Sequence, residues 1–245
     1  MGKRYQKKFE NMKKAGEISS SALKKVLDEV KPGVTLSDLD ALAEKEILAK
    51  GAEPAFKRVS DYDYATCINV NEGLVHGIPN NYALKSGDIV SIDLGAYYNG
   101  FNSDQCWTVE VETNEHAEFL ETGRVALKKA IKQARKGNKI GDISNAIQTT
   151  IEKKGYSVSR ELVGHGVGKT LHESPFVPGF GDIDSGKKLK EGMTLAIEVI
   201  YQKGKYPITT AKDGWTVQTA DNSLAAVFEH SIGITLDEPL VFTDF

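Results

Sequence analysis

The sequence predicts an α+β fold made of two related halves, and an internal repeat is the main observation behind this prediction. Residues 189–201 (LKEGMTLAIEVIY) match residues 84–96 (LKSGDIVSIDLGA) at an offset of 105 positions. Upstream, residues 135–155 match residues 31–51 at an offset of 104 positions. Two matches at nearly the same offset indicate two copies of one structural unit, each with helices followed by strands.

The repeat divides one domain, residues 1–245, into halves of roughly 1–112 and 113–245. The chain has the length of one large domain, and no linker or low-complexity segment interrupts it. Each half contains a strand in which an acidic residue interrupts an apolar run, Asp93 in the first half and Glu198 in the second. Packing of the halves about a pseudo-twofold axis would bring these two carboxylates together.

Composition and charge narrow the classes of protein to which this chain can belong. With 40% hydrophobic and 27% charged residues, it matches soluble globular proteins. A net charge of −3 gives no reason to expect specific nucleic-acid recognition, and no apolar run is long enough to cross a membrane. Residues 1–14 lack a signal-peptide core, and two cysteines do not make a disulfide framework. We therefore expect a cytoplasmic protein with reduced thiols.

The first predicted helix covers residues 3–30, where apolar side chains recur at three- and four-residue spacing. Its polar face is rich in lysine and arginine. Two interpretations fit a basic face: a solvated surface, or docking on an anionic partner such as the ribosome. A proline and a glycine at 32–33 end this helix. Ser37 or Asp38 can cap the next helix, which runs to Lys50.

The remaining elements follow from apolar periodicity and from the glycines and prolines between segments. A long amphipathic helix is expected at residues 114–136, and a second, shorter helix ends at Gly155. Residues 84–104 should form a hairpin of two strands joined by a tight turn. Further strands are predicted within residues 61–71, 161–168, 189–201 and 223–235.

Ionisable side chains stand in strands whose apolar neighbours should bury them. The set comprises Asp93, Asp104, His165, Glu198 and Glu229. A lone buried carboxylate costs several kcal/mol or stays protonated; alternatively, Asp93 and Asp104 are turn residues at the surface. Four carboxylates and one imidazole are too negative to coexist without cations, so the set predicts two divalent ions. Ligation by oxygen with one nitrogen favours Mn, Fe, Co or Zn.

Two histidines occupy equivalent places in the two halves. His76 in LVHGIP and His172 in TLHESP each have a proline three residues later, and each unit precedes an LKxG turn. A lone histidine at such a position is more often structural, but the repetition of the same unit in both halves predicts that both histidines line one cleft. Only seven residues separate His165 from His172, so spacing alone leaves open which of them binds a metal.

The order and spacing of these motifs resemble those of the type I methionine aminopeptidases over nearly the whole chain. The matching segments are CINVNEGLVHGIP around His76, SIDLG at Asp93, NGFNSD at Asp104, GHGVGKTLHESPFVPGFG around His165 and His172, AIEVI at Glu198 and FEHSIGIT at Glu229. The resemblance implies the duplicated pita-bread fold, with two α/β halves around a central antiparallel sheet. It also implies five metal ligands, with Asp104 and Glu229 bridging the ions: Asp93, Asp104, His165, Glu198 and Glu229.

The same resemblance implies removal of the N-terminal methionine from nascent proteins whose second residue is small. In that reaction a hydroxide activated by two metals attacks the scissile carbonyl. Glu198 would accept the proton of the water and pass it to the leaving amine. His172 would donate a hydrogen bond to the developing oxyanion, and His76 would lie near the scissile nitrogen. His76 and His172 are thus expected both to bind the substrate and to take part in catalysis.

The pocket for the methionine side chain is where the chain departs from the family. Tyr62, Cys67 and Trp215 match substrate-binding positions of that pocket. Val59 and Leu171 stand where related enzymes often have aromatic residues, which predicts a pocket of altered shape. The positions of the metal ligands are not affected by these differences.

Two alternatives to methionine removal were weighed. The first is an X-Pro aminopeptidase or dipeptidase of the same fold, but those enzymes usually have an extra N-terminal domain, for which this chain has no room. The second is a non-catalytic binding protein, but such relatives lose metal ligands, whereas all five positions are occupied here. We expect a monomer that acts on peptide N-termini without a membrane or a specific nucleic-acid partner.

Overall fold

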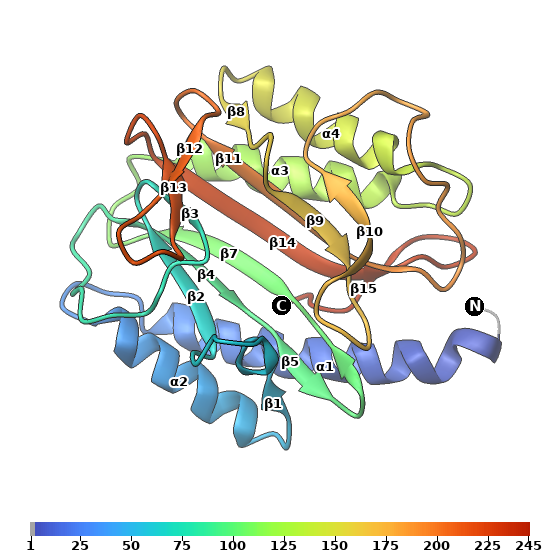
Figure 1. Ribbon diagram of the computed structural model, residues 1–245, viewed down its shortest axis with the longest axis horizontal. Helices are drawn as coiled ribbons and strands as arrows, with labels where there is room; N and C mark the ends of the chain where they lie inside the picture. Colours follow the sequence, from blue (N-terminus) through green and yellow to red (C-terminus); the bar gives the residue numbers. More distant parts are fainter. Residues whose placement is uncertain (1–2) are drawn as a thin grey trace.

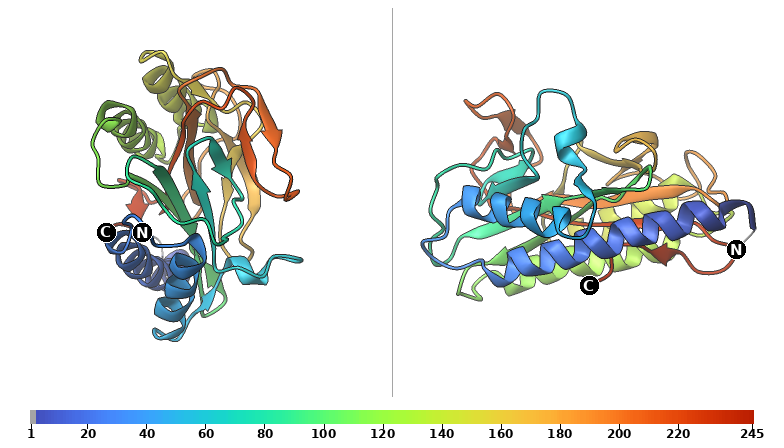
Figure 2. Two further views of the ribbon diagram at one scale, coloured as in Figure 1. Left: turned by 90° about the vertical axis from the view of Figure 1, so that its left-hand side faces the viewer. Right: turned by 90° about the horizontal axis from the view of Figure 1, so that it is seen from below.

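Two pairs of helices cover one face of a set of antiparallel sheets in the computed structural model, which describes residues 3–245 (Figure 1, Figure 2). This mixture of helices and antiparallel strands confirms the α+β prediction. Residues 1 and 2 belong to the predicted domain but lie outside the described part. Within residues 3–245, no helix is long and apolar enough to span a bilayer.

The elements follow the predicted order in both halves. The first half contains α1 (Lys3–Asp28), α2 (Leu36–Leu48), β1 (Glu53–Pro54), the 3-10 turn η1 (Phe56–Arg58), β2 (Thr66–Val70), β3 (Gly73–Val75), β4 (Ile89–Leu94), β5 (Ala96–Tyr98), β6 (Phe101–Asn102) and β7 (Gln105–Glu110). The second half contains α3 (Ala117–Gln133), α4 (Ile140–Glu152), β8 (Ser157–Val158), β9 (Val163–Gly166), β10 (Glu173–Pro178), β11 (Thr194–Gln202), β12 (Ile208–Thr210), β13 (Val217–Thr219), β14 (Ala225–Gly233) and β15 (Leu240–Val241).

The sheets of the two halves have matching strand orders. One sheet has the order β2-β4-β7, and the larger sheet contains the run β9-β11-β14, extended by β10 and β15 at its edges. Strand β8 also pairs with β11. Two small sheets, β1-β5-β6 and β12-β13-β3, flank these layers. In each half, the middle strand of three has the acidic residue that the sequence places in its apolar run, Asp93 in β4 and Glu198 in β11.

The internal repeat has the same backbone geometry in both halves. Gly33 and Gly137 both have a positive φ, of 87° and 102°, a conformation that glycine adopts without steric cost. Gly33 N donates to Leu84 O at 2.8 Å, and Gly137 N donates to Leu189 O at 3.1 Å. Each hydrogen bond joins the turn before the second helix of a half to the LKxG turn before its acidic strand.

Each helix pair packs on the strands of its own half. Residues of α1 and α2 bury their apolar side chains against β4 in one core, and α3 and α4 do the same against β11 and β14 in another. The approach is close where α3 crosses β14. A Cβ atom at Gly123 would lie 2.4 Å from the ring of Phe228, so this helix position admits only glycine unless the ring moves.

The start of α2 differs from the prediction that Ser37 or Asp38 caps the helix. Thr35 is the N-cap residue, and its hydroxyl accepts a hydrogen bond from Asp38 N at 3.1 Å. The Asp38 carboxylate in turn accepts from Thr35 N at 3.2 Å. Asp38 therefore belongs to the third helical position of a capping box, in which side chain and backbone satisfy each other reciprocally.

Two predicted strands are also interrupted. The strand expected from residue 61 begins only at Thr66, because Asp61 has a φ of 63° and the chain turns after it. The hairpin predicted for residues 84–104 contains the short strands β5 and β6, which pair with each other, and β5 pairs with β1 rather than continuing the main sheet. Asp104 consequently lies directly before β7.

Candidate metal centre and substrate cleft

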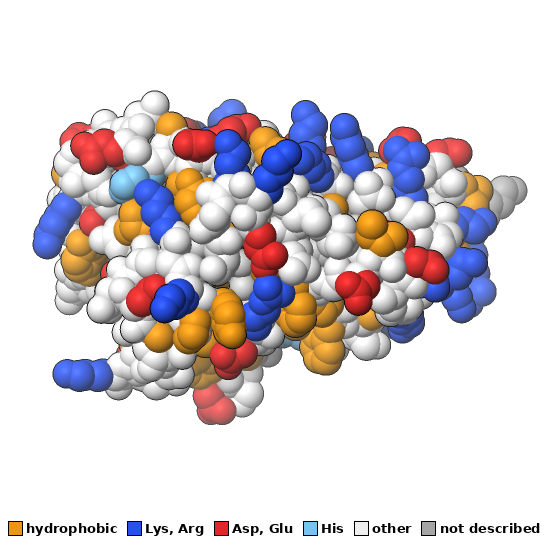
Figure 3. Space-filling view, turned by 90° about the horizontal axis from the view of Figure 1, so that it is seen from above, with side chains coloured by type: hydrophobic (Ala, Val, Ile, Leu, Met, Phe, Trp, Pro, Cys, Tyr) orange, Lys and Arg blue, Asp and Glu red, His pale blue; other side chains and the backbone are white. Residues whose placement is uncertain are grey.

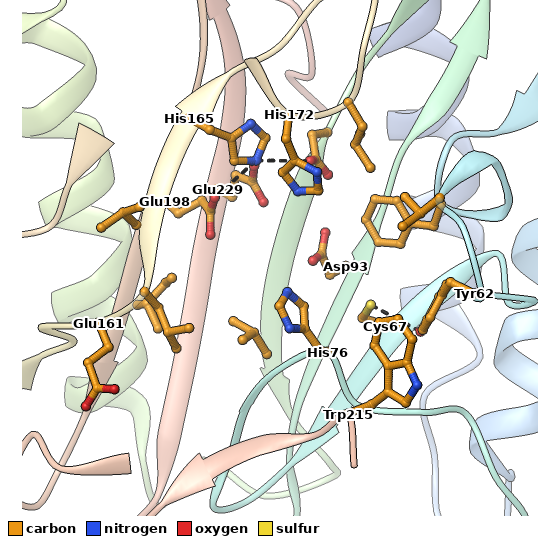
Figure 4. Close-up of a pocket in the computed structure, with 18 residues that line it drawn as sticks. Tyr62, Cys67, His76, Asp93, Glu161, His165, His172, Glu198, Trp215 and Glu229 are labelled. Atoms are coloured by element: carbon orange, nitrogen blue, oxygen red, sulfur yellow. Dashed lines mark hydrogen bonds and ion pairs between the residues drawn. The ribbon is translucent and has the colours of Figure 1, made fainter. Parts of the chain in front are cut away.

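A cavity of about 390 Å³ opens between the strands of the two halves. Its lining contains every residue that the sequence predicts for the site: Tyr62, Cys67, His76, Asp93, Asp104, His165, His172, Glu198, Trp215 and Glu229. Figure 4 shows Tyr62, Cys67 and Trp215 on one side of the cavity. His165, Glu198 and Glu229 lie on the other side in the same view. The cavity thus has an apolar aromatic side and a charged side.

The acidic side is assembled from separate strands. Asp93 lies in β4, Asp104 directly before β7, His165 in β9, Glu198 in β11 and Glu229 in β14. Glu198 and Glu229 are register partners in the antiparallel pair of β11 and β14, so their side chains leave the same face of the sheet. Two carboxylates placed directly opposite repel each other unless a proton or a cation lies between them.

These side chains form overlapping groups in which nitrogen and oxygen atoms lie within 4.8 Å of one another. One group contains Asp93, Asp104 and Glu229, and another contains His165, Glu198 and Glu229. Glu229 belongs to both groups. Asp104 also reaches the second group, because its Oδ2 lies 3.5 Å from His165 Nε2. Side chains shared between two neighbouring positions are the arrangement that a dinuclear site requires.

His165 presents one ring nitrogen to the carboxylates. Its Nδ1 donates to Gly166 O at 2.8 Å, so the lone pair is on Nε2. Nε2 lies 3.4 Å from Glu198 Oε1 and 3.5 Å from Asp104 Oδ2. Burial lowers the pKa of His165 to about 4, so the ring is neutral at pH 7. A neutral imidazole whose other nitrogen is tied to a carbonyl is the usual form of a histidine metal ligand.

The carboxylates fit divalent cations. Burial, reinforced by neighbouring carboxylates, raises the pKa of Asp93, Glu198 and Glu229 well above the ordinary range. Burial also raises the pKa of Asp104 to about 8. Among residues 3–245, Asp93 Oδ1, Asp104 Oδ1 and Glu229 Oε1 are buried oxygens without a hydrogen-bond partner. Unpaired buried oxygens are costly, and an oxygen-rich set with one imidazole suits first-row divalent metals.

His76 and His172 both line the cavity, as the sequence echo predicts. The rings of His165 and His172 have centroids 4.4 Å apart, and His172 also forms a group of ligand type with Asp104 and His165. His76 has a φ of 58°, a left-handed conformation that is uncommon for a residue with a Cβ atom. Burial lowers the pKa of both His76 and His172, so both rings are neutral at pH 7.

The apolar side of the cavity is built around Tyr62. Its hydroxyl donates to Thr66 O at 2.7 Å and lies 3.1 Å from Cys67 Sγ. The rings of Tyr62 and Trp215 contact each other with centroids 5.2 Å apart. Burial raises the pKa of the Cys67 thiol, so this wall is uncharged. The other apolar residues on this side are Phe56, Val59 and Leu171.

Several residues that line the cavity were not predicted from the sequence. Ile200 was detectable, because it lies two residues after Glu198 in one strand and therefore on the same face. Glu161 and Leu162 belong to the predicted strand that contains His165, so their proximity to His165 was a signal that they line the cavity. Val75 could have been predicted in the same way, because it is adjacent to His76. Phe56 lies in a 3-10 turn, where no periodic pattern indicates its direction.

Three comparisons with known proteins agree with this geometry. A sequence profile of metallopeptidase family M24 matches residues 10–236. The methionine aminopeptidase of Clostridium perfringens is 43% identical over 234 residues, which cover 95% of this chain and 94% of that protein. The crystal structure of methionine aminopeptidase from Thermotoga maritima matches with a TM-score of 0.95 and 42% identity, covering 98% of this chain and 97% of that one.

A prolidase structure matches less closely. The prolidase from Pyrococcus furiosus has a TM-score of 0.80 and 26% identity, and the match covers 98% of this chain but only 64% of that one. Prolidase and methionine aminopeptidase thus share the pita-bread fold with this chain, as the resemblance implied. The profile match, the extent of identity and the fold agree, and the chain therefore belongs to metallopeptidase family M24, within which it groups with the methionine aminopeptidases.

Proposed function

We propose that the chain is a dinuclear metalloaminopeptidase that removes the N-terminal methionine from nascent proteins when the second residue is small. The observation that supports this most strongly is that one cavity contains both a set of potential metal ligands and an apolar pocket. Overlapping groups of carboxylate and imidazole ligands lie beside an apolar pocket. The full-length similarity to methionine aminopeptidases favours methionine as the residue that fills this pocket.

Two divalent ions would occupy the overlapping groups. Asp93, Asp104 and Glu229 would hold one ion. His165 and Glu198 would hold the other, with Asp104 and Glu229 within reach of both. When bound, such ions lower the pKa of water and polarise a carbonyl oxygen. Mn, Fe, Co and Zn all suit this mixture of oxygen and nitrogen ligands.

Glu198 is the proposed proton acceptor. Its side chain is 13% exposed, whereas that of Asp104 is 5% exposed, so Glu198 is the more accessible to water and to a leaving amine. A carboxylate that accepts a proton from the attacking water can return it to the amine in the next step. His172, neutral and on the cavity wall, can donate a hydrogen bond to the oxygen that becomes negative. His76 is proposed to contact the scissile nitrogen.

The methionine side chain is proposed to enter the apolar side of the cavity. Tyr62, Cys67 and Trp215 would contact it, with Leu171 completing the wall. The hydroxyl of Tyr62 is already bonded to Thr66 O, so the pocket offers the thioether a surface without an unpaired polar group. An unbranched, polarisable side chain suits such an aromatic surface.

Specificity for the second residue can be tested directly. We expect Met-Gly and Met-Ala peptides to be cleaved with kcat/KM roughly tenfold or more above that of Met-Phe. The physical reason is that a cavity of about 390 Å³ must hold the whole methionine residue as well as the start of the next. The peptides should be identical beyond position two, so that only this side chain changes. Equal turnover of Met-Phe and Met-Gly would show that the cleft is not crowded.

An X-Pro peptidase is the alternative within the same fold. The assay that separates the two uses metal-depleted protein reloaded with one metal at a time and compares Met-Gly with X-Pro peptides. Cleavage of Met-Gly alone supports methionine removal. Cleavage of X-Pro alone would contradict it, and absence of both activities after reloading would favour a non-catalytic binding protein.

We further propose that the basic face of α1 docks on an anionic surface such as the ribosome. Arg4, Lys7, Lys13 and Lys14 are exposed on this helix, although Lys14 lies 3.6 Å from Glu17. Lys8 does not belong to the free face, because its Nζ donates to Gly192 O at 3.1 Å. The double substitution of Lys7 and Lys13 by glutamate should reduce co-sedimentation with ribosomes and leave Met-Gly cleavage unchanged. Unchanged co-sedimentation would contradict the docking proposal.

A monomer in the cytoplasm completes the proposal. The two cysteines, Cys67 and Cys106, are free and buried, as expected in a reducing compartment. The cavity is lined by residues of one chain, so a single copy supplies every proposed ligand.

A further inference from the structure

The two halves meet at a seam between β7 and β14 that is not a β-ladder. Figure 1 shows these strands side by side at the centre of the molecule, and the rings of Trp107 and Phe228 contact each other 5.0 Å apart. Each strand is paired on its other side, β7 with β4 and β14 with β11. Within residues 3–245, however, no backbone hydrogen bond joins β7 to β14. Buried backbone groups along the seam therefore need other partners.

Two side-chain hydroxyls supply these partners. Ser231 Oγ donates to Asp104 O at 2.7 Å and accepts from Asp104 N at 2.9 Å. Thr108 Oγ1 donates to Val227 O at 2.7 Å and accepts from Val227 N at 3.0 Å. In both cases one hydroxyl pairs with the amide and the carbonyl of a single residue across the seam. The hydroxyl thereby uses its one donor and one of its two acceptor sites. Ser231 and Thr108 are completely buried.

The bridges lie beside two of the proposed metal ligands, Glu229 and Asp104. On β14, Val227 and Ser231 lie two residues before and two residues after Glu229. On the other side of the seam, Asp104, directly before β7, is itself the residue whose backbone Ser231 holds. A single hydroxyl from the second half thus fixes the main chain of a ligand from the first half. In a β-ladder, the amides and carbonyls of two strands bond directly to each other. Here a side-chain hydroxyl from one side of the seam bonds to the backbone on the other side instead.

The C-terminal segment holds Ser231 from the other side. Ser231 N donates to Thr243 Oγ1 at 3.0 Å, and Phe242 N donates to Ser231 O at 2.9 Å. His230 Nδ1 also lies 3.0 Å from Thr243 Oγ1, and Thr243 is completely buried. The C-terminal segment thus holds both the amide and the carbonyl of Ser231, while its hydroxyl is bonded to Asp104.

We propose that Ser231 is a positioning residue whose hydroxyl sets the place of Asp104 relative to Glu229, and thereby the spacing of the ligands shared by the two ions. Thr108 performs the same task at the other end of the seam. The proposal rests on the proposed function, because it concerns the ligands of the proposed dinuclear site. Neither hydroxyl is required to touch a metal or the substrate.

The test compares Ser231→Ala with Ser231→Thr, which keeps the hydroxyl. Partners that orient metal ligands typically contribute 10–100-fold to metal affinity. We expect Ser231→Ala to bind Co²⁺ 10–100-fold more weakly in calorimetric titration and to change the visible absorption bands of bound Co²⁺. Ser231→Thr should recover most of the affinity and the wild-type absorption bands. Thr108→Val, which has the shape of threonine without its hydroxyl, should weaken Co²⁺ binding in the same direction.

Ser144→Ala is the matched control. Ser144 is equally buried, and its hydroxyl donates to Ile140 O within α4, away from the seam. This variant should lose a hydrogen bond and some thermal stability but retain the Co²⁺ affinity and spectrum of the wild type. If Ser231→Ala behaves like Ser144→Ala in both measurements, the positioning proposal is wrong. If neither Ser231→Ala nor Thr108→Val folds, the bridges serve folding rather than the site, which also overturns it.

Failure of the positioning proposal can be separated from failure of the proposed function. A wild-type protein that binds no Co²⁺ or cleaves no Met-Gly would contradict the proposed function. A wild-type protein that does both, together with an unaffected Ser231→Ala, would contradict only the role of the seam.

Discussion

Asp104→Ala is expected to bind at least one divalent ion fewer than the wild-type protein and to fall to the activity of the metal-depleted enzyme. Asp104 takes part in the group with Asp93 and Glu229, and its Oδ2 lies 3.5 Å from His165 Nε2. Asp104 therefore faces both proposed metal positions, as Glu229 does. Removing a shared ligand weakens both positions at once, whereas removing an unshared ligand weakens one.

Elemental analysis after dialysis gives the number of bound ions, and calorimetric titration gives their affinities. The matched comparison is Asp93→Ala, which removes a carboxylate found in one of the three ligand-type groups, whereas Asp104 is found in two. We expect Asp93→Ala to retain more of the second binding event than Asp104→Ala does. Wild-type stoichiometry in Asp104→Ala would remove the dinuclear interpretation.

Thermal unfolding adds a measurement that does not depend on activity. A ligand that binds only the folded state stabilises it by about 2.7 kcal/mol at a concentration one hundred times its Kd. The wild-type melting temperature should therefore rise when metal is added to the depleted protein. Asp104→Ala should show a smaller rise at the same metal concentration, because the Kd is higher. An equal rise in both proteins would contradict the assignment of Asp104 as a shared ligand.

Much of this site could be predicted from the sequence because the carboxylates proposed as ligands violate a simple pattern. Burying a carboxylate such as Asp93 or Glu198 inside an apolar strand is energetically costly, so its presence indicates that a cation or a proton neutralises its charge. The repeat then indicated that such strands come from two related halves. Glycines with positive φ at equivalent positions, Gly33 and Gly137, show why the repeat remained visible in the sequence. Few other residues tolerate that conformation.

Other features depend on contacts between residues far apart in the sequence. Ser231 and Thr108 are ordinary strand residues by pattern, and only the approach of β7 to β14 makes their hydroxyls into bridges. Phe56 enters the cavity from a short turn whose direction no periodicity indicates. The cap of α2 was misplaced by three residues or fewer because Ser37, Asp38 and Thr35 all have suitable side chains. The backbone geometry selects Thr35.

The assignment of His165 and His172 to different tasks was the choice that sequence spacing left open. Both rings lie near Asp104, and their centroids are 4.4 Å apart, so proximity alone does not separate them. Their hydrogen bonds do favour one assignment. His165 Nδ1 donates to Gly166 O and leaves Nε2 facing Glu198 and Asp104, as a metal ligand should. His172 is the more exposed of the two cavity-lining histidines.

His172→Ala should consequently keep both metals and bind peptide in the ground state while kcat falls. Loss of one hydrogen-bond donor to a developing oxyanion typically costs about 10²–10³ in rate, or roughly 3–4 kcal/mol. His165→Ala should instead bind metal more weakly, and excess metal should restore part of its activity by mass action. The two variants are matched, because each removes one neutral imidazole from the same cavity. Side-by-side metal titrations, followed by steady-state kinetics at saturating metal, distinguish a ligand from an oxyanion donor. If His172→Ala loses metal and His165→Ala retains it with a reduced kcat, the two histidines have been assigned the wrong way round.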